Sequence, residues 1–272
     1  MTAVYILGGI VLLLFLLYVF AVRCRKGHPG LEALRGWNYA HRGLHSQGIP
    51  ENSMAAFQEA LEGGYGIELD VHLMADGNLA VIHDPSLKRT AGADVQIKDL
   101  CLADLDNYRL EETQERIPTL PEVLALYDGK APLIVELKPE QNNHAALTKA
   151  VCDLLDGYKG VYCLESFDPR CIYWLRKNRP ELVRGQLGED FVRNPKSKLP
   201  WFLKWALTLQ LENFLVVPDF VSYKFADRKK LGNFLARKLW GAQGVTWTIT
   251  SQADLDTAVS DGWLPIFEGF RP

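Results

Sequence analysis

The chain begins with an apolar stretch of helical length. Residues 3–22 carry no charged side chain, and a helix rising about 1.5 Å per residue would cross the roughly 30 Å hydrocarbon layer of a bilayer over that length. The basic residues Arg23, Arg25 and Lys26 follow the stretch instead of preceding it, which is untypical of a cleaved signal peptide. The pattern predicts a retained transmembrane anchor at 1–22, a juxtamembrane linker at 23–37 and a folded domain at 38–272.

The basic flank also predicts an orientation. Because positive charge lies only on the C-terminal side of the apolar stretch, the positive-inside bias places the folded domain on the cytoplasmic side of the cell membrane. The five cysteines are odd in number and show no metal-binding spacing, which agrees with a reducing compartment. We therefore expect a single-pass protein that has the lipid bilayer as a partner through its N-terminal helix.

From residue 38 onward, short apolar or β-branched runs alternate with helical stretches, a pattern typical of βα units and a parallel sheet. Eight runs are predicted strands: 38–42, 66–72, 133–138, 161–166, 183–186, 219–223, 245–248 and 264–267. A ninth run, 79–83, follows too closely for a parallel crossover and is predicted as the return of a hairpin. Helices are expected to begin near residues 52–53, 121, 143, 169, 227 and 251. Eight such units predict an α/β fold, the TIM (β/α)8 barrel, preceded by one transmembrane helix.

One apolar insertion interrupts this alternation. Residues 199–214 carry Trp201, Trp205 and Phe214 among several leucines. Two interpretations stay open at this point: a helix packed on the barrel, or a membrane-facing lip or acyl-chain wall near the barrel mouth.

Composition and charge exclude several classes of protein. With 48% hydrophobic and 23% charged residues, the chain is neither disordered nor a coiled coil. Its net charge of −3 and the lack of a long Lys/Arg run argue against nucleic acid as a partner.

Polar side chains alternate with apolar ones in two predicted strands. In 66–72, the period of two directs Glu68, Asp70 and His72 toward the barrel interior, and in 133–138 it does the same for Glu136 and Lys138. Buried carboxylates require compensation by positive charge. That charge is either an internal salt-bridge network or a bound cation.

Three converging carboxylates favour the cation. Glu68, Asp70 and Glu136 would offer oxygen ligands, which suit one hard divalent ion, Mg²⁺ or Ca²⁺. The absence of thiolate ligands disfavours zinc. A network with Lys138 and Arg42 is the competing interpretation.

Two histidines stand where predicted strands end. His41 follows the first strand and His83 ends the hairpin return, so both are expected at the barrel rim. Beside a metal, one imidazole can act as general base and the other as general acid in phosphodiester hydrolysis. Arg42 and Lys138 are expected to stabilise the phosphate charge.

The chain resembles the glycerophosphodiester phosphodiesterase family over nearly the whole region after the apolar stretch. The matching motifs are His41-Arg42-Gly43, Pro50-Glu51-Asn52-Ser53, Ala56-Phe57, Glu68-Leu69-Asp70-Val71, Asp76-Gly77, His83-Asp84, Leu87-x-Arg89-Thr90-x-Gly92, Ile117-Pro118-Thr119-Leu120, Glu136-Leu137-Lys138, Ser166-Phe167 and Trp247-Thr248. The resemblance implies a TIM barrel that hydrolyses glycerophosphodiesters to glycerol phosphate and an alcohol. It implies catalysis by His41 and His83, metal binding by Glu68, Asp70 and Glu136, and phosphate contacts from Arg42 and Lys138.

The chain has two further features within and after these motifs. Glu51 and Asn52 are expected to support His41 from behind, with a helix cap as the alternative role for Asn52. The family usually has a Thr-Asp pair after its last strand, whereas this chain has Glu268-Gly269 after Phe267. The structure of that last loop is therefore not predicted.

Three functions fit these residues. The favoured one is hydrolysis of glycerophosphodiesters or lysophospholipids, with the headgroup and the question of a cyclic phosphate intermediate left open. A phospholipase D of the sphingomyelinase type is an alternative, which the motifs at 117–120 and 166–167 disfavour. A non-catalytic barrel that only binds lipid headgroups is disfavoured by the two histidines together with the three carboxylates.

Overall fold

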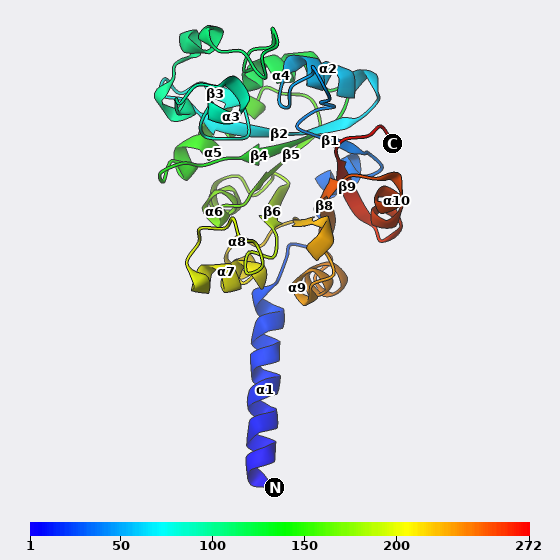
Figure 1. Cartoon of the computed structure of the whole chain (residues 1–272). Coiled ribbons are helices and arrows are strands. Elements are labelled where there is room, and N and C mark those ends of the chain that lie inside the picture. Colours follow the sequence, from blue (N-terminus) through cyan, green and yellow to red (C-terminus); the bar gives the residue numbers. More distant parts are fainter.

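A computed structural model describes residues 1–272 as a long N-terminal helix attached to the side of a closed barrel (Figure 1). The first helix, α1 (Thr2–Ala21), is long and apolar enough to cross a membrane by length and composition. None of its residues is buried against the rest of the chain.

The barrel consists of eight parallel strands that close on themselves, which confirms the predicted fold. They are β1 (Tyr39–His41), β2 (Gly66–Leu73), β4 (Leu133–Leu137), β5 (Tyr162–Ser166), β6 (Arg184–Gly188), β7 (Phe220–Lys224), β8 (Gln243–Ile249) and β9 (Trp263–Phe267). The first strand pairs with both β2 and β9 and so closes the ring. The predicted hairpin return is β3 (Leu79–Val81), which is antiparallel to β2.

Helices connect the strands and cover the outside of the barrel. They are α2 (Met54–Glu62), α3 (Lys88–Ala91), α4 (Leu120–Tyr127), α5 (His144–Leu155), α6 (Pro169–Asn178), α7 (Trp201–Thr208), α8 (Asn213–Val216), α9 (Leu231–Phe234) and α10 (Gln252–Ser260). Side-chain caps fix several starts: Ser53, Asp168 and Ser251 each accept a hydrogen bond from a backbone N–H of the first turn.

One predicted helix start is wrong. The helix expected near Asp227 begins at Leu231, after a short 3₁₀ turn at Phe225–Asp227. The Asp227 carboxylate accepts a hydrogen bond from the backbone N–H of Asp190 at 3.0 Å, so it fastens the loop after β6 instead of capping a helix.

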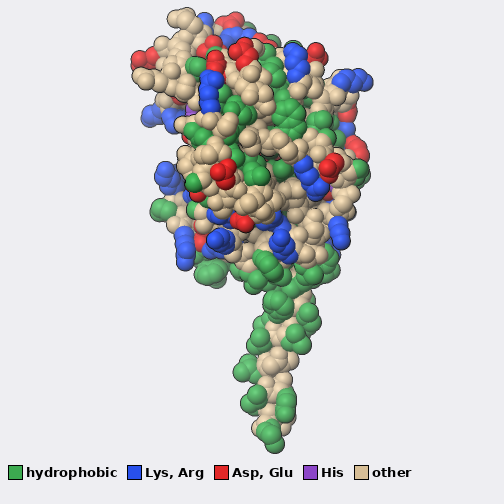
Figure 2. Space-filling model, turned by 90° about the vertical axis from the view of Figure 1, so that its right-hand side faces the viewer, with side chains coloured by type: hydrophobic (Ala, Val, Ile, Leu, Met, Phe, Trp, Pro, Cys, Tyr) green, Lys and Arg blue, Asp and Glu red, His purple; other side chains and the backbone are tan.

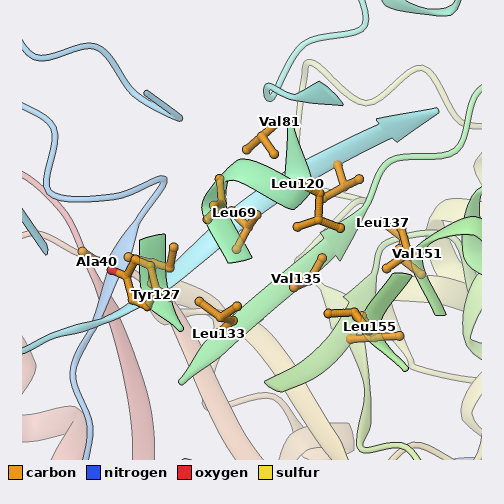
Figure 3. Packing of buried hydrophobic residues seen from close by; sticks show 14 of the residues in the cluster. Ala40, Leu69, Val81, Leu120, Tyr127, Leu133, Val135, Leu137, Val151 and Leu155 are labelled. Atoms are coloured by element: carbon orange, nitrogen blue, oxygen red, sulfur yellow. The ribbon is translucent and has the colours of Figure 1, made fainter. Parts of the chain in front are cut away.

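Two apolar clusters stabilise the barrel. The larger one lies between strands and helices, where Leu69 and Val135 pack near Leu120 of α4 (Figure 3). The smaller one fills the amino-terminal end of the barrel interior, and Leu31 and Leu34 of the 3₁₀ helix η1 (Pro29–Leu34) belong to it. Part of the segment 23–37 is therefore folded as a plug beneath the barrel, and the polar residues are left to the opposite end.

Candidate active site

The predicted site residues meet at the carboxyl ends of the strands, around a cavity of about 130 Å³. Strand register places Glu136 beside Asp70 and beside Glu165, and it places His41 beside Glu68. The lining includes His41, Arg42, Glu68, His83, Glu136, Lys138, Glu165, Phe167 and Trp247. Asp70 lies directly beneath this lining and is 1% exposed.

The three predicted metal ligands come together as a buried acidic cluster. Ligand oxygens of Glu68, Asp70 and Glu136 all lie within 4.8 Å of one another. Burial and the neighbouring carboxylates raise the pKa of Glu68 well above its ordinary value. Burial likewise raises the pKa of Glu136, to about 7. The cluster thus carries more negative charge than its surroundings compensate, which is the electrostatic condition that a bound divalent cation relieves.

Lys138 supplies part of the compensation. Its Nζ lies 2.9 Å from Asp70 Oδ1 and 2.8 Å from Glu136 Oε2. Burial opposes the ionisation of Asp70, but Lys138, His83 and Arg42 outweigh it and hold the pKa of Asp70 below its ordinary value. The salt-bridge network considered from the sequence therefore exists alongside the acidic cluster.

Glu68 and Glu165 are the carboxyl groups with the least compensation from cations, and burial raises the pKa of both. Glu68 Oε2 accepts a hydrogen bond from the backbone N–H of Arg42 at 3.2 Å and has no hydrogen bond from a cationic side chain. Glu165 is 1% exposed, and its Oε2 has no hydrogen-bond partner. Glu165 was not predicted from the sequence, although the same period of two directs it inward from β5.

His41 is held by a carboxylate that the sequence reasoning also missed. Its Nδ1 lies 2.5 Å from Glu268 Oε2, and its Nε2 lies 3.9 Å from Glu68 Oε2. The hydrogen bond from His41 lowers the pKa of Glu268 to about 2. Burial outweighs this carboxylate and lowers the pKa of His41. Barrel closure creates this contact, because Ala40 pairs with Phe267 and the next residues of both strands are then neighbours.

His83 has a matching arrangement. Its Nδ1 lies 2.7 Å from Asp84 Oδ1, and Arg89 Nε donates to the other Asp84 oxygen at 2.5 Å. Burial and the nearby Lys138 lower the pKa of His83 to about 4. The backbone carbonyl of His83 accepts a hydrogen bond from His72 Nε2 at 3.1 Å, so His72 positions this loop.

The two predicted supporting residues hold other partners than His41. Glu51 Oε1 accepts hydrogen bonds from Arg42 at 3.0 Å and from Arg89 at 2.6 Å. The Asn52 amide donates to Asp70 Oδ2 at 2.8 Å. Asn52 is not the helix cap, because Ser53 fills that position and Asn52 has a left-handed φ of 51°.

Aromatic side chains form one wall of the cavity. Phe167 makes edge-to-face contacts with Trp247 at 5.6 Å and with Phe191 at 6.1 Å between ring centroids. This wall is apolar, whereas the facing side presents the carboxylates and imidazoles. The site thus offers a charged centre beside an apolar surface.

Comparison with known proteins identifies the family of the chain. The model of the glycerophosphoryl diester phosphodiesterase family matches residues 41–259. A glycerophosphodiester phosphodiesterase from Caldanaerobacter subterraneus is 28% identical over 233 residues, which cover 82% of this chain and 89% of the relative. A lysophospholipase D from Rattus norvegicus is 33% identical over 168 residues, covering 56% of this chain and 51% of the relative.

The fold agrees with solved structures. A phosphodiesterase from Oleispira antarctica, solved in complex with the product sn-glycerol-3-phosphate, superimposes with a TM-score of 0.69 at 22% sequence identity. The superposition covers 87% of this chain and 94% of that chain. Because the family model spans most of the barrel, from His41 in β1 to Val259 in α10, the chain belongs to the glycerophosphoryl diester phosphodiesterase family.

Proposed function

We propose that the chain hydrolyses glycerophosphodiesters to a glycerol phosphate and an alcohol by a metal-dependent reaction in the 130 Å³ cavity. The observation that carries the proposal is the convergence of two imidazoles and three carboxylates on one cavity at the carboxyl ends of the barrel strands. Membership of the family supports the reaction class. The experiment that tests it is hydrolysis of a soluble glycerophosphodiester with identification of both products.

The acidic cluster fits one Mg²⁺ or Ca²⁺ ion. Glu68, Asp70 and Glu136 would hold it, since hard cations prefer oxygen ligands and the cluster has uncompensated negative charge. When bound, such an ion polarises a phosphoryl oxygen and offsets the charge that develops there. Lys138 keeps Asp70 ionised for this role, because it lies 2.9 Å from that carboxylate.

His41 and His83 are the proposed proton-transfer pair. In each ring Nδ1 hydrogen-bonds to a carboxylate, Glu268 for His41 and Asp84 for His83, which leaves Nε2 to hold or move a proton. Burial lowers the pKa of both rings, which favours the neutral imidazole that a proton acceptor requires. One neutral Nε2 would take the proton of the attacking hydroxyl, and the other ring, entering the step as the imidazolium held by its carboxylate, would give its Nε2 proton to the leaving alcohol.

Arg42 and Lys138 are the proposed phosphate contacts. Arg42 is fixed by Glu51 at 3.0 Å and lies 3.5 Å from Asp70, which leaves further guanidinium N–H groups free to donate. Both cations line the cavity and would stabilise the negative charge of the phosphodiester.

Lysophospholipids are proposed as a second substrate class, and α1 as a membrane anchor. The partial relative named as a lysophospholipase D and the apolar wall of Phe167 and Trp247 support the first proposal. The length and composition of α1 support the second, and the basic residues that follow it favour a cytoplasmic location of the barrel.

Replacing Glu268 tests whether it orients His41. In Glu268→Gln we expect kcat to fall by about tenfold or more with KM little changed, because the imidazole loses the carboxylate that holds Nδ1. The lost carboxylate also stabilises the imidazolium, so the pKa of His41 should fall further. The limb of the kcat/KM profile that reports His41 should therefore move to lower pH.

The control for this variant is Glu59→Gln. It removes the ion pair between Glu59 of α2 and Arg271, which lies three residues after Glu268. It should leave kcat and the pH profile unchanged. An unshifted profile in Glu268→Gln would show that Glu268 does not act on His41.

A further inference from the structure

Exposed apolar side chains gather on three segments that are far apart in the sequence. They belong to α7, to α8, and to α9 with the π-helical turn η5 (Leu235–Leu239) that continues it. Trp201 is 75% exposed, and six of these residues define what we call the apolar collar: Trp201, Phe202, Trp205, Phe214, Leu231 and Phe234. Several large exposed apolar side chains that lie together usually mark a surface that binds a membrane, a protein or a ligand.

The segments α8 and α9, which carry part of the apolar collar, contact the C-terminal end of α1. Arg23 donates to the carbonyl of Phe214 at 2.9 Å, and Trp240 Nε1 donates to the carbonyl of Val19 at 2.8 Å. A Cβ atom on Gly232 would lie 3.0 Å from the Tyr18 hydroxyl, so the last turn of α1 also rests on α9. Figure 1 shows α7, α8 and α9 grouped where α1 leaves the barrel, and Figure 2 shows hydrophobic side chains gathered at the same place.

Helix length fixes the depth of the collar relative to a bilayer. Because Tyr18 and Val19 are partly covered by the barrel, the freely exposed part of α1 runs from Thr2 to Leu17. At about 1.5 Å per residue this part is roughly 24 Å long, which is less than the roughly 30 Å of the hydrocarbon layer. If α1 spans a layer of that thickness, the last turn of α1 and the collar beside it lie at the edge of the hydrocarbon layer or within it.

The same segments carry positive charge, which is complementary to anionic lipid headgroups. Lys196, Lys198 and Lys204 lie on or just before α7, and residues 192–209 contain no Asp or Glu. Residues 229–241 add Lys229 and Lys238 without any acidic residue. Figure 2 shows Lys and Arg side chains in a band beside the hydrophobic base. Cations next to an apolar face are typical of surfaces that bind anionic headgroups.

We propose that the apolar collar inserts into the headgroup region and outer acyl layer of the leaflet that faces the barrel, so that the barrel rests on the membrane on its β6–β8 side. The occupant of this surface is the lipid bilayer, and the collar is a second, monotopic attachment in addition to α1. The inference goes beyond the proposed reaction and rests on α1 as a membrane span.

This placement connects the membrane to the active site. The loop between β6 and α7 starts at the barrel mouth, where Phe191 contacts Phe167 of the cavity wall. The backbone N–H of Val192, the next residue, donates to Thr208 Oγ1 of α7 at 3.3 Å, so the cavity wall adjoins the helix that carries the collar residues Trp201 and Trp205. A lysophospholipid that leaves the bilayer would therefore meet α7 before its phosphodiester reaches the cavity.

Depth-dependent quenching tests the insertion on the full chain in vesicles of phosphatidylcholine and phosphatidylglycerol. Phe234→Cys and Trp205→Cys, each in a Cys101→Ser background, receive an environment-sensitive fluorophore. The native chain labelled at Cys101, its one exposed thiol, is the control. We expect lipids with a nitroxide near the headgroup end of the acyl chain to quench the two collar labels, while aqueous iodide quenches the Cys101 label several-fold more strongly.

Two results would overturn the inference. Equal iodide quenching at all three sites, in protein that floats with the vesicles, would show that α1 anchors the chain and the collar stays in water. If the chain does not float with the vesicles, neither α1 nor the collar attaches it to the membrane. The proposed reaction is checked independently in each case, by hydrolysis of soluble glycerophosphocholine.

A substrate comparison tests the path across α7. In Trp201→Ser/Trp205→Ser we expect a several-fold loss of turnover of lysophosphatidylcholine in vesicles and unchanged turnover of soluble glycerophosphocholine. The control Leu102→Ser/Val259→Ser removes exposed apolar side chains elsewhere and should affect neither substrate. Equal loss on both substrates would indicate a structural role for α7 and contradict the path.

Discussion

Alanine in place of either His41 or His83 is expected to lower kcat by about 100- to 10,000-fold, because each ring supplies one of the two proton transfers. Each has Nδ1 on a carboxylate, at 2.5 Å from Glu268 and 2.7 Å from Asp84, so truncation removes an oriented group that water does not replace. The measurement is the steady-state hydrolysis of glycerophosphocholine, with unfolding followed in parallel to show that the barrel is intact.

His144→Ala is the matched control for the two variants. This histidine opens α5 and lies outside the cavity, so its loss should leave kcat unchanged. Full activity in either His41→Ala or His83→Ala would disprove the assignment of the pair.

Glu68→Gln is expected to abolish metal-dependent activity while raising the unfolding temperature of the metal-free protein. Glu68 is 2% exposed, and no cationic side chain hydrogen-bonds to it, so a neutral isostere removes repulsion from Asp70 and Glu136. Adding Mg²⁺ or Ca²⁺ should then stabilise the native chain by mass action and leave the variant unaffected. Thermal unfolding with and without chelator measures both effects.

The control for Glu68→Gln is Glu122→Gln, whose carboxylate caps α4 through the N–H of Thr119 at 2.8 Å. It should lower the unfolding temperature and retain the response to metal. A native chain whose unfolding temperature does not change with either ion would contradict the acidic cluster as a metal site.

The barrel and most of the site could be predicted because their signals are local. The alternation of βα units gave the eight strands, and the period of two in β2 and β4 directed Glu68, Asp70 and Glu136 to one side. The matching motifs predicted the family, which the family model confirms.

The partners that depend on barrel closure could not be predicted in the same way. Glu268 meets His41 only because β9 pairs with β1, a contact between residues 227 positions apart. Glu51 and Asn52 hold Arg42 and Asp70 because both lie in a loop whose path the sequence does not specify. For the insertion at 199–214, the structure shows a helix whose tryptophans are exposed, and its contact with lipid stays a proposal.

The proposed collar bears on how α1 would act as the proposed anchor. A flexible tether would leave the barrel free to rotate above the membrane, whereas contacts from Arg23 and Trp240 fix α1 against the barrel. Arg25 adds a partly buried ion pair with Asp219 at 2.5 Å. The barrel mouth would then keep one orientation toward the lipid surface.

The most direct test of the central claim is metal titration of glycerophosphocholine hydrolysis with identification of the products. We predict glycerol phosphate and choline as the products, loss of activity on chelation, and recovery on adding back Mg²⁺ or Ca²⁺ to the cluster of Glu68, Asp70 and Glu136. Undiminished hydrolysis in chelator, or release of phosphocholine and glycerol instead, would contradict the account.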